Sequence, residues 1–346
     1  MNRVFLALLI LTPVALAGGW LGWSPLAVFL LSAAALIPLA KFIGDATEEL
    51  AGHTNPAIGG LLNATFGNAT ELMVGIFALH AGLIEVVKAS ITGSIIGNLL
   101  FVLGTAMLLG GWKRERQNFN ATAAKAAGSM LLLATIALVI PAIFGATSGA
   151  ALPVEHLSVF VAVLLIAAYV AQLFFTLHTH KHLYQEESRV DALRWKLPTA
   201  LLVLFAATVG AAVVSDTLVN SITPLVEQFG WSQLFIGVIV IAIVGNAAEH
   251  LSAVTVAIKD RMDLALQISI GSATQLVTFV APVLVLLSLF YATPMNLVFS
   301  PFELVAIVFS VFVTNAVVED GVSTWFEGFQ LITAYIIMAV AFFFYV

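Results

Sequence analysis

The sequence predicts an all-α polytopic membrane protein with eleven transmembrane helices, arranged as one N-terminal helix and two inverted-topology repeats of five helices each. Of its 346 residues, 61% are hydrophobic and only 9% are charged, whereas a soluble domain carries about 25% charged residues. Apolar segments of about 18 residues or more recur along the chain, which is typical of membrane-spanning helices. A short motif of the first half also recurs in the second half.

Six apolar segments in the first part of the chain predict six helices. The N-terminus also resembles a signal peptide, because Ala15-Leu16-Ala17 is typical of a cleavage site. A retained first helix agrees better with the distribution of charges described below. The predicted spans are 4–22, 25–49, 57–81, 84–110, 122–144 and 155–182.

Five further helices are predicted after a short polar segment. Several spans exceed the roughly 20 residues that a perpendicular helix needs, so we expect tilts or breaks. The spans are 197–220, 232–258, 262–290, 299–318 and 325–345. We therefore divide the chain into an extra N-terminal helix (1–23), a first repeat half (24–182), a short cytoplasmic linker (183–196) and a second repeat half (197–346).

The distribution of basic residues between the two sides of the membrane is a check on the predicted number of helices. Alternating eleven spans across the membrane places Lys88 alone on one side and every other lysine and arginine on the other. Cytoplasmic loops are enriched in Lys and Arg, so the second side is predicted to be cytoplasmic. The N-terminus is then cytoplasmic and the C-terminus external. The twelve cytoplasmic residues are Arg3, Lys41, Lys113, Arg114, Arg116, Lys125, Lys181, Arg189, Arg194, Lys196, Lys259 and Arg261.

The repeated motif is Gly-Asn-Ala-Thr-Glu at 67–71 and Gly-Asn-Ala-Ala-Glu at 245–249. A Gly-Ser pair follows each glutamate at the same spacing, at 93–94 and at 271–272, so both matches share an offset of 178 (249 − 71 and 272 − 94). Two matches in one register indicate a duplication. Because each half has five spans, the second half enters the membrane from the opposite side, as in many secondary transporters.

The spacing within each repeat also predicts depth. The midpoint between Glu71 and Ser94 falls in the predicted turn at 82–83, and the midpoint between Glu249 and Ser272 falls in the turn at 260–261. Each of the four residues is then about 11 residues from a turn, or roughly 17 Å at 1.5 Å per residue. This depth is near the middle of a hydrocarbon core of about 30 Å.

Two carboxylates at the membrane midplane indicate an ion path. A charged side chain at this depth costs at least a few kcal/mol, so such residues mark transport sites unless they only join helices. The sequence offers no lysine or arginine at that depth as a fixed counter-ion. Glu71 and Glu249 are therefore expected to bind a divalent cation or protons at the same oxygens.

The neighbouring side chains suit a hard cation. Calcium takes 6–8 oxygen ligands in irregular geometry, and glycines at 67, 93, 97, 245 and 271 would let helices break or pack closely. Interhelical hydrogen bonding and small-residue packing remain alternatives for the neutral residues. His250 follows Glu249 and points about 100° away on a helix, so it has either an accessory or a packing role. The neutral candidates are Asn68, Asn246, Ser94, Ser272, Asn98 and Gln275.

Other classes of protein lack support in the sequence. The motifs HExxH and GxSxG are absent, as are zinc-ligand spacings and cysteines, so we expect no enzyme and no cofactor. The expected partners are the transported ions Ca²⁺ and H⁺ and the lipid bilayer, with no nucleic acid. A homo-oligomer is compatible with this interpretation.

The repeat motifs resemble the two α-repeats of the calcium/proton exchanger family, a branch of the cation/calcium exchanger superfamily. The resemblance rests on residues 60–68, 67–71 and 90–98 in the first half and on 245–250 and 271–275 in the second half. It covers nearly the whole chain. It implies eleven helices, proton-driven Ca²⁺ efflux at Glu71 and Glu249, and sliding of the first helix of each half as a gate.

Two further family features are present in weaker form. The family's Ala-Thr-Glu pattern after the second helix appears at 46–48, and Ser215-Asp216 resembles its counterpart. Glu48 and Asp216 are thus either portal residues or ordinary polar residues at a helix end. The acidic segment between the halves is reduced to Glu186, Glu187 and Asp191.

Several alternatives stay open. A sodium/calcium exchanger or a passive cation channel could use the same scaffold, although the neutral Gln275 favours protons. The short central loop suggests a prokaryotic plasma membrane, with a vacuolar membrane as the alternative in a eukaryote.

Overall fold

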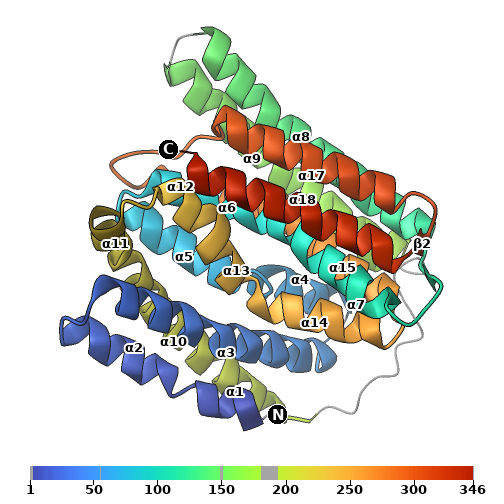
Figure 1. Ribbon diagram of the computed structural model, residues 1–346, viewed down its shortest axis with the longest axis horizontal. Helices are drawn as coiled ribbons and strands as arrows, with labels where there is room; N and C mark the ends of the chain where they lie inside the picture. Colours follow the sequence, from blue (N-terminus) through green and yellow to red (C-terminus); the bar gives the residue numbers. More distant parts are fainter. Residues whose placement is uncertain (1–2, 55, 149–150, 181–193, 346) are drawn as a thin grey trace.

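The protein is a bundle of long helices, seen here in a computed structural model that describes residues 3–54, 56–148, 151–180 and 194–345 (Figure 1). Among the described residues, eight helices are long and apolar enough to cross a membrane, or nine if one bent pair counts as a single span. The prediction of a multi-spanning helical protein is confirmed. The predicted linker at 183–196, with Glu186, Glu187 and Asp191, lies almost wholly outside the described residues.

The elements of the first part follow the predicted spans closely. Two spans contain segments with π-helical hydrogen bonding, labelled η. The elements are α1 (Arg3–Leu8), α2 (Leu11–Trp20), α3 (Pro25–Gly52), α4 (Pro56–Phe66), α5 (Ala69–His80), α6 (Ile84–Ile96), η1 (Gly97–Val102), α7 (Leu103–Gly111), β1 (Gln117–Asn118), α8 (Ala121–Ser148), α9 (Ala151–Phe174) and η2 (Phe175–Thr179).

The elements of the second part include a short helix that the sequence did not predict. This helix, α11, follows α10 directly and has an apolar face. The elements are α10 (Leu197–Asn220), α11 (Ile222–Phe229), α12 (Gln233–Phe235), η4 (Ile236–Ile241), α13 (Ala242–Gly245), α14 (Ala247–Ile258), α15 (Met262–Gln275), η5 (Leu276–Val280), α16 (Ala281–Ser288), α17 (Pro301–Val317), β2 (Val322–Ser323) and α18 (Trp325–Phe344).

Breaks and length explain why the number of membrane-length helices differs from eleven. The span predicted at 57–81 is divided into α4 and α5, and the span predicted at 232–258 bends by 54° between α13 and α14. Helix α17 is apolar but has only 17 residues. The count of eleven stays a prediction, because it requires α4 with α5, and α17, to cross the membrane.

Equivalent elements occur in the two halves at the offset of the sequence repeat. Helices α5 and α14 start at Ala69 and Ala247, and α6 and α15 start at Ile84 and Met262, in each case 178 residues apart. The π-helical segments η1 and η5 lie one after each Gly-Ser pair. The duplication therefore extends from the motif to the local backbone, whereas the inversion of the second copy stays a prediction.

The helices form three groups across the bundle. Helices α1, α2, α3 and α10 lie together on one side, and α8 and α9 lie on the opposite side (Figure 1). The helices that carry the repeat motifs, α5, α6, α13, α14 and α15, lie between these groups. The candidate site is therefore central in the bundle.

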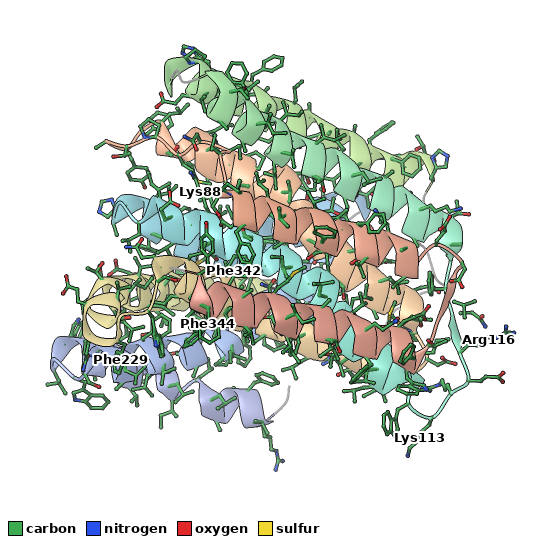
Figure 2. The ribbon with its side chains drawn as sticks, turned by 45° about the horizontal axis from the view of Figure 1, so that its top comes forward. Lys88, Lys113, Arg116, Phe229, Phe342 and Phe344 are labelled. Carbon is green, nitrogen blue, oxygen red and sulfur yellow. The ribbon has the colours of Figure 1, made fainter. Side chains whose placement is uncertain are left out.

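Contacts between loops agree with the predicted alternation of the chain. The loop after α7 contacts the turn before α15, where Arg114 pairs with Asp260 at 3.4 Å, and strand β1 pairs with β2. All three connections are predicted to be cytoplasmic. On the predicted external side, Lys88 donates to the carbonyl of Val298 at 2.8 Å. Figure 2 shows Lys88 and the basic pair Lys113 and Arg116 at opposite ends of the bundle.

Candidate cation-binding site

Each repeat glutamate lies at the start of a helix that begins inside the bundle. The helical backbone is interrupted at Asn68 (φ −106°, ψ 25°) and at Asn246 (φ −89°, ψ 7°), and a new helix starts one residue later. Glu71 and Glu249 are thus the third residues of α5 and α14. The first turn of a helix has free N–H groups and a positive dipole end, so it favours a carboxylate.

Glu71 is buried against the helix break of the other half. Only 8% of its surface is exposed, and a Cβ atom added to Gly245 would lie 3.3 Å from its Oε1. The glycine at this position therefore lets the carboxylate of one half approach the backbone of the other half closely.

Two cavities of about 10 Å³ each lie beside Glu71, and Ser90 lines both. This volume is close to that needed for one water molecule. Leu36 and Leu218 line the first cavity, and Leu284 lines the second. The surroundings of Glu71 are thus mainly apolar, with space for single small species.

Glu249 lies in the first turn of α14, three residues after Asn246 and four residues after Gly245, against which Glu71 packs. The Oε2 atom of Glu249 is buried and has no hydrogen-bond partner among the described residues. A buried carboxylate oxygen without a partner is costly, so this atom is available to a cation or a proton.

The six neutral candidates form one hydrogen-bond network that joins the two halves. Asn98 lies at its centre, and its Oδ1 is buried without a partner among the described residues. The bonds run from Asn68 Nδ2 to Gln275 Oε1 (2.7 Å), from Ser272 Oγ to Asn68 Oδ1 (3.4 Å), from Asn98 Nδ2 to Asn246 Oδ1 and Ser272 Oγ (3.0 Å each), and from Asn246 Nδ2 to Ser94 Oγ (2.8 Å).

Close packing of small residues brings the two halves of this network together. A Cβ added to Gly93 would lie 2.0 Å from the carbonyl oxygen of Val238, and one added to Gly237 would lie 2.4 Å from the Cβ of Ala89. Helix α6 therefore packs on η4 nearly backbone to backbone. This approach places Ser94, next to Gly93, within reach of Asn246.

The candidate site offers many oxygen ligands and few charged groups. No group of three or more His, Asp, Glu or Cys residues that could hold a metal ion occurs in the part of the chain that the structure describes. No lysine or arginine is among the hydrogen-bond partners of the network in the same residues. Two carboxylates with amide and hydroxyl oxygens suit Ca²⁺ better than a transition metal.

The accessory candidates lie in different places. The ring of His250 packs edge-on against Phe101 at 5.5 Å, and its Nε2 has no partner among the described residues. Glu48 and Asp216 are both exposed and are not brought together: Glu48 lies near the end of α3 and Asp216 near the opposite end of the adjacent α10. Their proposed portal roles stay predictions.

Sequence reasoning did not identify Ser90 or Glu303. Ser90 is one helical turn before Ser94, and this spacing was the available signal. Glu303 is fully buried and accepts a hydrogen bond from Thr92 at 3.0 Å. Ser300 lies three residues before Glu303, which is the pattern of a capping box, and the structure contains this cap.

The chain is similar to known proteins in both sequence and structure. The chain matches the family described as sodium/calcium exchanger protein over residues 24–178 and again over 199–344. It is 46% identical to the Ca²⁺/H⁺ antiporter ChaA of Bacillus subtilis, with 99% of both chains covered. It is 44% identical to a Ca²⁺/H⁺ antiporter of Synechocystis, covering 99% of this chain and 98% of the relative. The solved structure of the Ca²⁺/H⁺ antiporter protein YfkE has a TM-score of 0.87 at 44% identity, with 99% of both chains covered.

Proposed function

Because the chain belongs to the sodium/calcium exchanger protein family, we propose that it is an antiporter that exchanges cytoplasmic Ca²⁺ for external H⁺. Relatives that match over the full length are named Ca²⁺/H⁺ antiporter, which supports both the identity of the transported ions and the antiport. The observation that carries the proposal is the close approach of the Glu71 carboxylate to Gly245, in the helix break before Glu249, beside a network of neutral oxygens. Bacterial relatives support a prokaryotic plasma membrane.

The two carboxylates supply the charge that selects a divalent cation. Carboxylate and neutral oxygens are the ligands that Ca²⁺ prefers, and the helix N-termini beside both glutamates stabilise the ionised forms. When Ca²⁺ leaves, two ionised carboxylates remain close together in a site of low polarity, which is unfavourable. Protons then replace the cation at the same oxygens.

Coupling follows from this exchange of charges. An empty site with two ionised carboxylates is too costly to pass through the membrane, so only the Ca²⁺-loaded and the protonated forms change their accessibility. Helices α3 and α10 move against the rest of the bundle in this scheme. The sequence positions of Glu48 and Asp216, at opposite ends of this helix pair, support portals on opposite sides.

Transport by the purified protein in proteoliposomes tests this function. With an acidic interior and no sodium, Ca²⁺ uptake is expected to require the pH gradient and to stop when a protonophore is added. Uptake that ignores the pH gradient but follows a sodium gradient would assign the chain to sodium-coupled exchange. Uptake that follows neither gradient would indicate a passive pathway.

A further inference from the structure

The cytoplasmic ends of α3 and α10 are joined by an unusual set of hydrogen bonds, outside the candidate site. The Glu49 carboxylate of α3 accepts from the backbone N–H of Arg194 (3.0 Å) and of Trp195 (3.1 Å). The His53 ring, one turn later, contacts the carbonyl oxygen of Trp195 at 2.9 Å through Nε2. We refer to Glu49, His53, Arg194 and Trp195 as the clip.

In the clip, the side chains of α3 bond to backbone atoms of the residues before α10. A carbonyl oxygen only accepts, so Nε2 of His53 carries the proton and donates. Both the N–H and the C=O of Trp195 are therefore bonded to α3, while its side chain packs against the hydrophobic core. Glu49 and His53 are four residues apart and lie on one face of the helix end. The start of α10 is thus held whatever side chain position 195 carries.

The clip occurs at one end of the helix pair. Helices α3 and α10 run antiparallel, since the end of α3 meets the residues that precede α10. Along their length, the contact is apolar and close, as where Leu39 packs on Gly210. At the other end, no hydrogen bond joins the start of α3 to the end of α10 in the part of the chain that the structure describes. The hydrogen bonds between this helix pair are therefore concentrated at its predicted cytoplasmic end.

We propose that Glu49 and His53 are positioning residues that make the cytoplasmic ends of α3 and α10 move as one body during transport. The proposal rests on the proposed function, in which these two helices change the accessibility of the site. Because the two helices belong to different repeat halves, the clip transmits movement from one half to the other. Without the clip, each helix can move alone, and fewer movements of the helices change the accessibility of the whole site.

Substitutions separate this role from cation binding. Glu49→Ala and His53→Ala are expected to lower the maximal rate of Ca²⁺ uptake at least fivefold, with Ca²⁺ affinity in calorimetric titration unchanged. His53→Gln keeps an N–H donor and is expected to restore most of the rate. Glu115→Gln, an exposed carboxylate on another predicted cytoplasmic loop, is the matched control. A weaker Ca²⁺ affinity in Glu49→Ala, or an unchanged rate in both alanine variants, would overturn the proposal.

A covalent replacement of the clip gives the sharper test, because the chain contains no cysteine. The double variant Glu49→Cys and Trp195→Cys is joined by a short, reducible bis-thiosulfonate linker. We expect the linked protein to transport at nearly the wild-type rate and the reduced protein at the rate of Glu49→Ala. A linked protein that cannot transport would show that these ends must separate, and equal rates in both forms would show that the clip is not needed.

A readout that does not depend on transport distinguishes failure of the clip from failure of the proposed function. Spin labels on Gly52→Cys and Lys196→Cys report the distance between the two helix ends. One narrow distance is expected with Ca²⁺ at high pH and without Ca²⁺ at low pH, and a broader distribution is expected when Glu49→Ala is added. Distances that change with the ions in the otherwise unchanged chain would overturn the proposal, even if Ca²⁺/H⁺ exchange is confirmed.

Discussion

Glu71 and Glu249 occupy equivalent positions in the repeat but different surroundings. Glu71 is buried beside two small apolar cavities, whereas Glu249 is half-buried and its Oε2 has no hydrogen-bond partner among the described residues. The two halves therefore supply similar charges with different solvation. Both carboxylates remain necessary in the proposed exchange, because each half supplies one of the two charges that balance Ca²⁺.

Neutralising either glutamate tests this requirement. Glu71→Gln and Glu249→Gln keep the size and the hydrogen-bonding capacity of the side chain but remove the charge that Ca²⁺ and protons share. We expect each variant to fold and to lose Ca²⁺ exchange, by at least about a hundredfold. The measurements are Ca²⁺ uptake in proteoliposomes and elution as a single peak in size-exclusion chromatography. Normal uptake by either variant contradicts the assigned role.

Competition between the two ions gives a second prediction for these residues. If protons and Ca²⁺ bind the same oxygens, acidification on the side of Ca²⁺ entry removes the ionised form that Ca²⁺ requires. The apparent Ca²⁺ affinity is therefore expected to fall by about tenfold or more between pH 8 and pH 6, with the maximal rate less affected. A half-saturating Ca²⁺ concentration that does not change with pH would indicate separate sites.

The repeat identified candidate site residues in the sequence, but not their hydrogen-bond partners. Glu71 and Glu249 were selected because the motif occurs twice at a fixed offset within apolar segments. The bond between Asn68 and Gln275 links residues 207 positions apart, and no local pattern encodes such a pairing. Ser90 was not among the candidates, because its place beside two cavities arises only when the helices pack.

At the level of elements, the crossing of α6 and η4 determines whether the two halves of the network meet. Gly93→Ala is expected to abolish transport and to lower the yield of folded protein, because the added Cβ would lie 2.0 Å from a backbone oxygen of Val238. Backbone atoms at such a crossing cannot move aside without separating the helices. Transport and the elution profile are the measurements.

A matched control lies four residues further along. A Cβ added to Gly97 would have no heavy atom within 4 Å, so Gly97→Ala is expected to fold and to retain most of its activity. If Gly97→Ala is as damaging as Gly93→Ala, close packing at this crossing is not the cause.

The turn between α14 and α15 uses an aspartate where the first half uses a glycine. Asp260 has a positive φ of 62°, and Gly82, at the equivalent repeat position, has a φ of 74°. Asp260 Oδ1 accepts a bond from Gln117 at 2.9 Å and pairs with Arg114. These contacts with the loop after α7 offset the strain of a left-handed backbone at a non-glycine residue.

Two effects determine the stability of variants at Asp260: the strain of its left-handed backbone and the loss of its contacts with Gln117 and Arg114. Asp260→Gly loses the contacts but relieves the strain, whereas Asp260→Ala loses the contacts and keeps the strain, at a cost of about 1 kcal/mol more. The melting temperature in detergent is thus expected to decrease from the wild type to Asp260→Gly and further to Asp260→Ala. The exposed neighbour Lys259→Ala serves as control. An alanine variant as stable as the glycine variant would contradict this account.

The positions of the helices could be predicted from the sequence because each long apolar segment corresponds to a helix. The breaks were less predictable: excess length indicated that some spans must tilt or break, but the interruptions at Asn68 and Asn246 depend on tertiary contacts. The short helix α11 was missed because eight residues between two spans give too weak a periodic signal.

At the scale of the whole molecule, connections predicted on one side of the membrane contact one another. Arg114 reaches Asp260, β1 pairs with β2, and Glu49 reaches the residues before α10. At the other end, His80 packs edge-on against Tyr291 at 5.9 Å. The sequence prediction rested on charge alone, so these contacts are an independent observation that favours the same alternation.

Cysteine labelling in intact cells tests this alternation and the orientation together. The chain has no cysteine of its own, so single substitutions at exposed positions report one site each. Lys113→Cys and Glu319→Cys are expected to react only with a membrane-permeant maleimide, because the concentration of basic residues predicts that their loops are cytoplasmic. Glu85→Cys and Glu227→Cys are expected to react with an impermeant reagent as well.

If all four reactivities are reversed, the alternation of the chain holds but the predicted orientation is wrong. If Lys113 and Glu319 label from opposite sides, the alternation itself fails, since β1 and β2 could not then pair in the membrane-embedded protein.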